Sequence, residues 1–277
     1  MKVLMLGSGA ADIHAPRMCN CENCSAVKQR GGHSVRTFTS VLIDDELLVD
    51  CGRTVPAQIR KLDAGARVTS VLITHTDSDH MDPIALAELP TDPTQYELPV
   101  YGSNDVVSKL RYEAQSQLDL HVLKPFERSN VNGYDVEPLP ARHRSVPGAA
   151  LLFVISREDE HLFFACDTGP LPQDTLEALG DKQLDIVIAE ATFGLKTENT
   201  ADLETAHMNF PMVCELRQDL LKRGVIGEET PFIATHLSLH HCPPHEASAE
   251  WLRERGVILG FDGMVLDRQG DPSSREG

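Results

Sequence analysis

The chain has 277 residues, of which 41% are hydrophobic, and a formal net charge of −17. This length can bury one large core, and no run of 18 apolar residues exists, so we expect no membrane span. Lysine and arginine are scattered and form no basic stripe, which argues against long RNA or DNA as a partner. Seven cysteines, three of them in a CxCxxC pattern, favour reduced thiols, a metal site and a cytoplasmic protein.

Apolar runs bounded by turn residues predict strands throughout the first half of the chain. The predicted strands are residues 2–6, 39–43, 46–50, 69–74 and 98–102. The predicted helices are residues 54–63, 83–89 and 103–118. Asp82 is the expected N-cap of the second helix, because Pro83 suits the first helical position. Residues 12–36 are polar and predict an irregular loop.

The second half continues the same alternation. Asn132-Gly133 predicts a hairpin turn, and residues 157–160 predict another. The predicted strands are residues 121–131, 134–142, 151–156, 161–167, 185–191, 231–236 and a final pair within 257–267. The predicted helices are residues 203–223 and 244–255. Two runs of strands, each interrupted by helices, fit a sandwich of two sheets in a single domain that covers residues 1–277.

Histidine and aspartate follow several of these strands directly. Imidazole nitrogen and carboxylate oxygen are ligands that zinc, manganese and iron accept. Strand ends are common positions for chemistry, so we expect these side chains to meet at one metal site. They are His75, Asp77, Asp79, His80, His143, Asp167 and His236.

The predicted loop at residues 12–36 contains Cys19, Cys21 and Cys24. Three thiols within six residues can converge on one tetrahedral zinc ion, which needs a fourth ligand. The stretch after His236 supplies three candidates, which are His240, His241 and Cys242. A zinc ion held in this way would clip the N-terminal loop to the edge that carries the other metal ligands and stabilise both.

These motifs together resemble a known superfamily. The order Thr-His-x-x-x-Asp-His, an isolated His, Asp-Thr-Gly and Thr-His is similar to that of the metallo-β-lactamase superfamily of binuclear metallohydrolases. The opening LGSGA, the closing GFDGM and the CNCENC cluster resemble the phosphodiesterases of the phosphonate-degradation (carbon–phosphorus lyase) pathway and their relatives. The resemblance implies a four-layer αββα sandwich, an α/β fold with helices on both outer faces.

The resemblance also implies roles for individual residues. One divalent metal, zinc or manganese, would take His75, His143 and residue 77, the second would take Asp79, His80 and His236, and Asp167 would bridge the two. His240 would complete a structural zinc site with the three cysteines. A metal-bound hydroxide would attack a small or cyclic phosphodiester. The resemblance assigns Asp79 and His207 to catalysis, with His207 contacting phosphate or protonating the leaving group.

Residue 77 departs from the family pattern, because Asp77 stands where relatives have histidine. One alternative is that Asp77 ligates through oxygen and shifts the first site towards manganese or iron. A second is that Asp77 turns away and leaves one metal weak or absent, and a third is that both metals are lost. With Asp77 as a ligand, two divalent cations are balanced by three carboxylates and one hydroxide, so the site is neutral and we expect weaker turnover.

Two other functions stay open. A relative in pyrroloquinoline-quinone synthesis shares the cysteine cluster and also departs from the histidine-rich loop, which would imply oxidation of a precursor. A non-catalytic binding protein that holds only the structural zinc is the second alternative. The retained His75, His143, Asp167 and His236 favour the hydrolase, with a small-molecule phosphodiester as its substrate. The oligomeric state is open, with a homodimer as one alternative.

Overall fold

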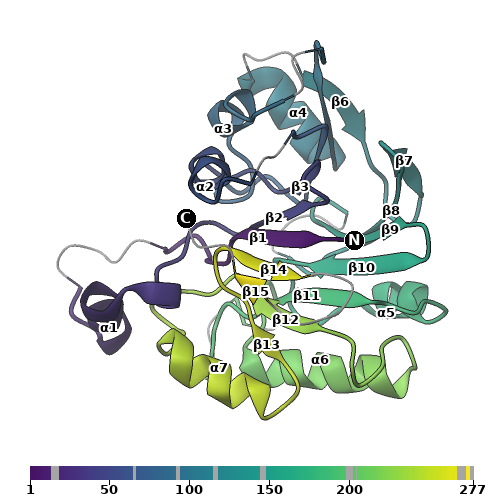
Figure 1. Ribbon diagram of the computed structural model, residues 1–277. Coiled ribbons are helices and arrows are strands. Elements are labelled where there is room, and N and C mark those ends of the chain that lie inside the picture. The colour runs from purple at the N-terminus through teal and green to yellow at the C-terminus, as the bar shows by residue number, and fades with distance from the viewer. Residues whose placement is uncertain are drawn as a thin grey trace.

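The computed structural model describes residues 1–13, 19–64, 67–91, 94–114, 118–143, 148–197, 202–203, 205–266 and 273–274. Two stacked β-sheets form its centre (Figure 1). The first sheet has the strand order β15-β14-β1-β2-β3-β4-β5-β6 and the second β13-β12-β11-β10-β9-β8-β7. The strands of the first sheet are β1 (Val3–Gly7), β2 (Ser40–Ile43), β3 (Leu47–Val49), β4 (Ser70–Ile73), β5 (Leu98–Gly102), β6 (Leu118–Val122), β14 (Met264–Leu266) and β15 (Ser273–Ser274). Those of the second are β7 (Ser129–Val131), β8 (Tyr134–Pro140), β9 (Leu151–Arg157), β10 (Glu160–Ala165), β11 (Ile186–Glu190), β12 (Phe232–Thr235) and β13 (Ile258–Leu259).

Helices cover both outer faces of this pair of sheets, as Figure 1 shows. The first sheet is covered by α2 (Val55–Lys61), α3 (Pro83–Ala87) and α4 (Asn104–Glu113). The second is covered by α5 (Gln173–Leu179), α6 (Phe210–Lys222) and α7 (His245–Arg253). A further helix, α1 (Glu22–Arg30), lies to one side of the sandwich and is followed by a 3-10 turn, η1 (Gly32–Ser34). None of the described helices combines the length and apolarity needed to cross a membrane.

Three hydrophobic clusters hold the layers together. The central cluster packs the two sheets face to face, with Phe153 and Phe164 from one sheet against Val41 and Leu72 from the other. The two outer clusters lie between each sheet and its helices. Strands that are buried on both faces explain the near-continuous apolar runs of the sequence, since a strand with one solvated face would alternate. The predicted αββα fold is therefore confirmed.

The strand directions decide where functional side chains meet. Strands β3 to β6 are mutually parallel, and so are β10 to β13. Chain segments that leave parallel strands emerge at the same edge of a sheet. Three non-glycine residues within two positions of the ends of such strands have left-handed backbones, with φ of 62° at Asp50, 54° at Asp167 and 56° at His236. Each backbone turns sharply and aims its side chain across the edge.

Several predicted elements differ from the structure. Residues 12–36 are not one irregular loop, because Cys21 caps α1 through its Sγ atom, which accepts from the Cys24 backbone N–H. The helix predicted at 203–223 begins only at Phe210, where Asn209 is the N-cap and a proline follows in the first turn. The helix predicted at 103–118 ends at Glu113.

Other differences concern the strands. The stretch 121–131 contains parts of two strands, β6 and β7, which belong to different sheets. The expected pair within 257–267 is likewise divided, since β13 and β14 lie in different sheets. Helix α5 and the short strand β15 were not predicted.

A buried polar cluster next to α1 links both ends of the chain. Arg36 donates to Ser8 Oγ at 2.6 Å and to the Gly260 carbonyl at 2.7 Å. Asp262, from the GFDGM sequence, accepts from Ser8 Oγ at 2.7 Å. The Arg36 guanidinium also lies 3.1 Å from His245 Nδ1, so this nitrogen accepts and the imidazole is neutral. The cluster explains why the opening and closing motifs occur together.

Candidate metal centre

The loop after β4 is held by its own backbone and by the segment after β3. The Cys51 N–H donates to the His80 carbonyl at 2.7 Å, and the Asp82 N–H donates to the Cys51 carbonyl at 2.9 Å. Asp82 caps α3 as predicted, accepting from two backbone N–H groups of the first turn. Gly52 is required here, because a Cβ atom would stand 2.1 Å from the Asp79 carbonyl oxygen. The loop is therefore fixed before any ligand binds.

Three side chains form a first donor group at the open edge of the site. Asp77 Oδ2 lies 3.5 Å from His75 Nε2 and 3.5 Å from His143 Nε2. The Asp77 side chain is 52% exposed, whereas both histidine side chains are buried. The carboxylate points towards the histidines, as expected if Asp77 ligates through oxygen.

A second, fully buried donor group lies beside the first. His80 Nε2 and His236 Nε2 are 3.2 Å apart, and Asp79 Oδ2 lies 3.4 Å from the former and 3.5 Å from the latter. Asp167 lies between the two groups, because its Oδ2 is 3.2 Å from His75 Nε2 and 3.1 Å from His80 Nε2. The structure thus brings together all seven side chains that the sequence singled out.

The four imidazoles of these groups share one orientation. Each turns Nε2 into the site, and an oxygen of a supporting residue lies within hydrogen-bonding distance of its Nδ1, although Nδ1 of His236 also lies 3.0 Å from Asp167 Oδ1. The Nδ1 distances are 3.0 Å from His75 to Thr74 Oγ1, 2.8 Å from His80 to Asp50 Oδ2, 3.3 Å from His143 to the Ala206 carbonyl and 2.8 Å from His236 to Thr192 Oγ1. An oxygen acceptor at Nδ1 leaves the Nε2 lone pair available once a cation replaces the proton there, which is the usual support of metal-binding histidines.

His207 is oriented by a buried glutamate. Glu190, at the end of β11, is fully buried and accepts from the Thr168 N–H at 3.0 Å and from Thr192 Oγ1 at 2.6 Å. Its Oε1 atom lies 3.0 Å from His207 Nδ1. His207 also approaches the centre, since Nδ1 is 3.6 Å from Asp167 Oδ1. The predicted helical position of His207 is wrong, because the residue precedes α6.

The charges of the side chains in the site compensate one another. Burial alone would raise the pKa of Asp167, yet the neighbouring His236 and His80 hold it well below its usual value. Burial alone would lower the pKa of His236, yet Asp167 raises it to about 10. Hydrogen bonds from His143 and His75 keep the pKa of Asp77 far below the ordinary value. Protonated imidazoles therefore supply positive charge where cations would otherwise balance the carboxylates.

The donor spacing fits divalent metal ions. Ligands about 2.0–2.1 Å from a tetrahedral zinc ion lie about 3.3 Å from one another, and the donor atoms described above are 3.1–3.5 Å apart. Within the described residues, His75 Nε2 and Asp167 Oδ1 are buried without a hydrogen bond of good geometry. Buried polar atoms normally have partners, so these two atoms are consistent with ligands that await a cation.

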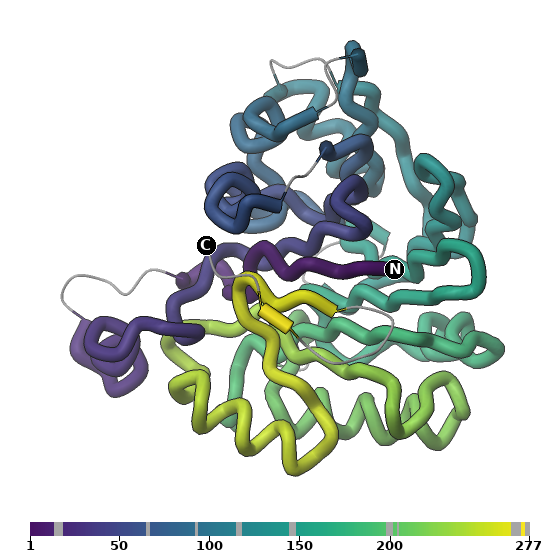
Figure 2. The backbone as a smooth tube through the Cα atoms, viewed as in Figure 1, coloured from purple at the N-terminus to yellow at the C-terminus, as the bar shows by residue number. Residues whose placement is uncertain are grey.

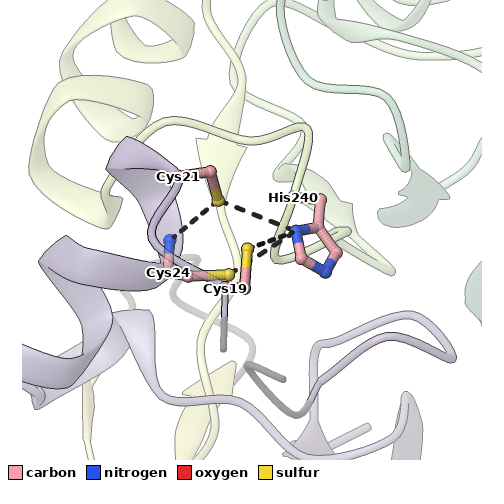
Figure 3. Close-up of side chains that lie close together, drawn as sticks. All are labelled: Cys19, Cys21, Cys24 and His240. Atoms are coloured by element: carbon pink, nitrogen blue, oxygen red, sulfur yellow. Dashed lines mark hydrogen bonds between the residues drawn. The ribbon is translucent and has the colours of Figure 1, made fainter. Parts of the chain in front are cut away.

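The three cysteines converge on a different histidine (Figure 3). His240 Nδ1 lies 4.0 Å from Cys19 Sγ, 3.7 Å from Cys21 Sγ and 3.5 Å from Cys24 Sγ. Sulfur and nitrogen ligands of a tetrahedral zinc ion are about 3.6 Å apart, so this set also fits zinc. Figure 2 shows α1 beside the segment that precedes α7, and Asn23 Nδ2 donates to the His240 carbonyl at 3.1 Å.

The alternative fourth ligands lie elsewhere. His241 packs against Phe193, with tilted rings whose centroids are 5.2 Å apart, and Cys242 is buried with its thiol 3.5 Å from the Thr192 carbonyl. His241 and Phe193 line an open cavity of about 260 Å3 that also includes Asp77, Asp79, Asp167 and His207. The cavity leads from the surface to the donor groups and could admit a small substrate.

Sequence reasoning missed the residues that support the ligands. Asp50 accepts from the Thr74 backbone N–H at 2.8 Å as well as contacting His80. Asp50 follows the apolar strand β3 just as Asp167 follows β10, so the same strand-end signal could have found it. Thr74 carries no comparable signal, because a threonine beside a strand is ordinary.

Comparisons with known proteins agree with the fold described above. The family model described as Beta-lactamase superfamily domain matches residues 45–227. The structure is similar to a crystal structure of a new diphosphatase from the PhnP family, with 21% identity, 96% of each chain covered and a TM-score of 0.74. It is also similar to Zn2+-bound PqqB from Methylobacterium extorquens, with 16% identity, 96% of this chain and 100% of that chain covered, and a TM-score of 0.73.

Human tRNase Z, short form, shares the fold at 17% identity, with 96% of this chain and 99% of that chain covered and a TM-score of 0.62. At these identities the structural likenesses establish the fold alone. The search of curated proteins returned no match. Because the family model covers well over half of the sequence, the chain belongs to the β-lactamase superfamily. It is a member of the family of hydrolases that have the metallo-β-lactamase fold.

Proposed function

We propose that this protein is a metal-dependent phosphodiesterase that acts on small phosphodiesters. The observation that carries the proposal is that four imidazoles turn Nε2 towards the carboxylates while each Nδ1 has an oxygen of a supporting residue beside it. Divalent cations in such a site supply Lewis acidity and lower the pKa of a water molecule. Similarity to a PhnP-family diphosphatase supports phosphorus–oxygen bond cleavage as the class of reaction.

The residues of the chain have separate tasks in this proposal. His75, Asp77 and His143 would hold one cation, and Asp79, His80 and His236 the other, with Asp167 between them. His207 faces the same cavity and would deliver a proton to the leaving oxygen. Burial opposes protonation of His207, but Glu190 raises its pKa above the ordinary value, which favours an imidazole that can donate a proton.

The diesterase proposal is tested with a panel of substrates. The protein is stripped with a chelator, reloaded with manganese or zinc, and assayed on bis(p-nitrophenyl) phosphate, p-nitrophenyl phosphate and a lactone. We expect the diester to be cleaved fastest. Absence of diester cleavage by protein that holds two metal ions per chain would refute the proposal.

The proton-donor role of His207 is tested separately. His207→Ala should slow cleavage of an alkyl phosphodiester by about 10²- to 10⁴-fold and affect the activated aryl diester much less, since nitrophenolate leaves without a proton. His121→Ala, which removes an exposed histidine on β6, is the control. Equal losses on alkyl and aryl substrates would remove the general-acid role.

A second candidate is an oxidative enzyme. Two histidines with one carboxylate, as in the group of His75, Asp77 and His143, suit iron(II), and Zn2+-bound PqqB has the same fold. Protein reloaded with iron(II) and assayed for oxygen uptake with candidate reductants separates the two. Oxygen uptake that Asp77→Ala abolishes, without diester hydrolysis, would favour the oxidative enzyme.

A further inference from the structure

A single short segment joins the two candidate metal centres. His236, directly after β12, contributes Nε2 to the buried donor group, and His240 contributes Nδ1 to the cysteine group. Only three residues separate these histidines. On one side, the Leu237 N–H donates to the Ser8 carbonyl at 3.0 Å and the Leu237 carbonyl accepts from the Ala10 N–H at 3.1 Å. A displacement of either histidine would therefore be transmitted along this segment.

One carboxylate anchors the segment between the two histidines. Asp12 Oδ2 accepts from Ser238 Oγ at 2.6 Å and from the His240 N–H at 3.3 Å, and Asp12 Oδ1 accepts from the Leu239 N–H at 3.2 Å. Asp12 is half-buried and lines the cavity that leads to the main centre. Each carboxylate oxygen accepts from a different backbone N–H, and the His240 N–H is shared with Ser238 Oγ at 3.2 Å. An amide in the same place would direct N–H bonds against one of these donors.

We propose that Asp12 is a positioning residue that couples the cysteine centre to the main metal centre. Through its three hydrogen bonds it makes residues 238–240 one rigid unit, so a cation that fixes His240 also holds the backbone of His236. His236 needs such support because its left-handed backbone is unfavourable for a non-glycine residue. Coupling of this kind is reciprocal, so binding at either centre strengthens binding at the other.

The coupling is measured without any substrate. Metal affinity of the main centre is determined by competition with a chromophoric chelator, and elemental analysis gives the zinc content. Cys21→Ser weakens the cysteine centre but leaves a serine that can still cap α1. We expect this variant to bind metal at the main centre at least about 5-fold more weakly. Cys214→Ser, a change of a half-buried cysteine in α6, is the control.

Asp12→Asn tests the coupling residue itself. This variant should lower the metal affinity of the main centre. In the double variant, Cys21→Ser should cause no further loss of that affinity, which is the outcome expected when one contact carries the coupling. Asp159→Asn, on an exposed turn, is the control. Ser238→Ala removes the shortest hydrogen bond and should give a partial loss of coupling, which keeps the test informative if Asp12→Asn fails to fold.

Two outcomes would overturn the inference. One is equal metal affinity of the main centre with and without Cys21→Ser. The other is an undiminished effect of Cys21→Ser in the Asp12→Asn chain. The inference rests on metal binding by both centres but not on the diester substrate. A protein that shows the coupling and cleaves no phosphodiester would refute the proposed function alone.

Discussion

Replacing Asp77 by histidine tests how charge governs the first donor group. The Asp77 carboxylate is ionised at working pH, because hydrogen bonds from His143 and His75 hold its pKa low. Asp77→His therefore removes one negative charge next to the place where an anionic substrate would bind. If Asp77 is a ligand, the metal-loaded site changes from neutral to a net charge of about +1.

The expected magnitude follows from distance and exposure. Two unit charges about 4 Å apart interact by about 1 kcal/mol in water and by about 4 kcal/mol at an effective dielectric constant of about 20. The side chain is 52% exposed, so we take the lower part of this range, about 1–2 kcal/mol. That corresponds to about 5- to 30-fold tighter binding of a monoanionic diester.

The assay combines an inert diester with metal analysis. Inhibition by dimethyl phosphate reports anion affinity, and elemental analysis reports how many metal ions remain. Asp77→Asn is the matched control, because it removes the charge and keeps an oxygen donor. Both variants should bind the anion more tightly, and Asp77→His should keep its metal content. If Asp77→His lowers both metal content and turnover, Asp77 is an adapted ligand and the charge argument fails.

Two further predictions concern stability. Gly52→Ala should lower the free energy of unfolding by about 1–3 kcal/mol and reduce metal content, because its Cβ would collide with the Asp79 carbonyl. Urea denaturation measures the loss. Gly227→Ala is the control, because its Cβ would meet only one atom, at 3.9 Å. His245 has a pKa lowered to about 3 by burial and by the adjacent guanidinium. Below pH ~6.5 this histidine is therefore protonated in the unfolded chain but not in the folded chain. The free energy of unfolding then decreases as the pH is lowered. His245→Asn should reduce the stability difference between pH 7 and pH 5 by about 1 kcal/mol, allowing for partial exposure; an unchanged difference would contradict the assignment.

Strand ends were the most predictive feature of the sequence. His75, Asp167 and His236 each follow an apolar strand, and the parallel strand directions explain why they meet. These strand ends could be predicted because a strand that is buried on both faces is apolar throughout, so its first polar residue marks where it ends. The resemblance to a known superfamily then supplied the pairing of ligands, which spacing alone could not give.

The remaining features depend on contacts that are distant in sequence. Asp12 acquires its importance only when the chain folds, since its partner Ser238 is 226 residues away. Helix α1 was not predicted because cysteine is an uncommon N-cap. The sulfur of Cys21, which caps this helix, is also a candidate zinc ligand. Helix α6 was predicted too long, although Asn209 followed by a proline in the first turn is a recognisable start.

The left-handed backbones at Asp50, Asp167 and His236 have a consequence for how the protein tolerates mutation. Each such position costs about 1–3 kcal/mol in a non-glycine residue, so chemistry and conformational strain reside in the same residues. Glycine at these sites would relieve the strain while deleting the donor, and a stability-selected library should therefore enrich glycine there. A library selected for activity should instead be depleted of glycine at these positions. A position where glycine is enriched by selection for stability and depleted by selection for activity would be one that the protein retains for its function.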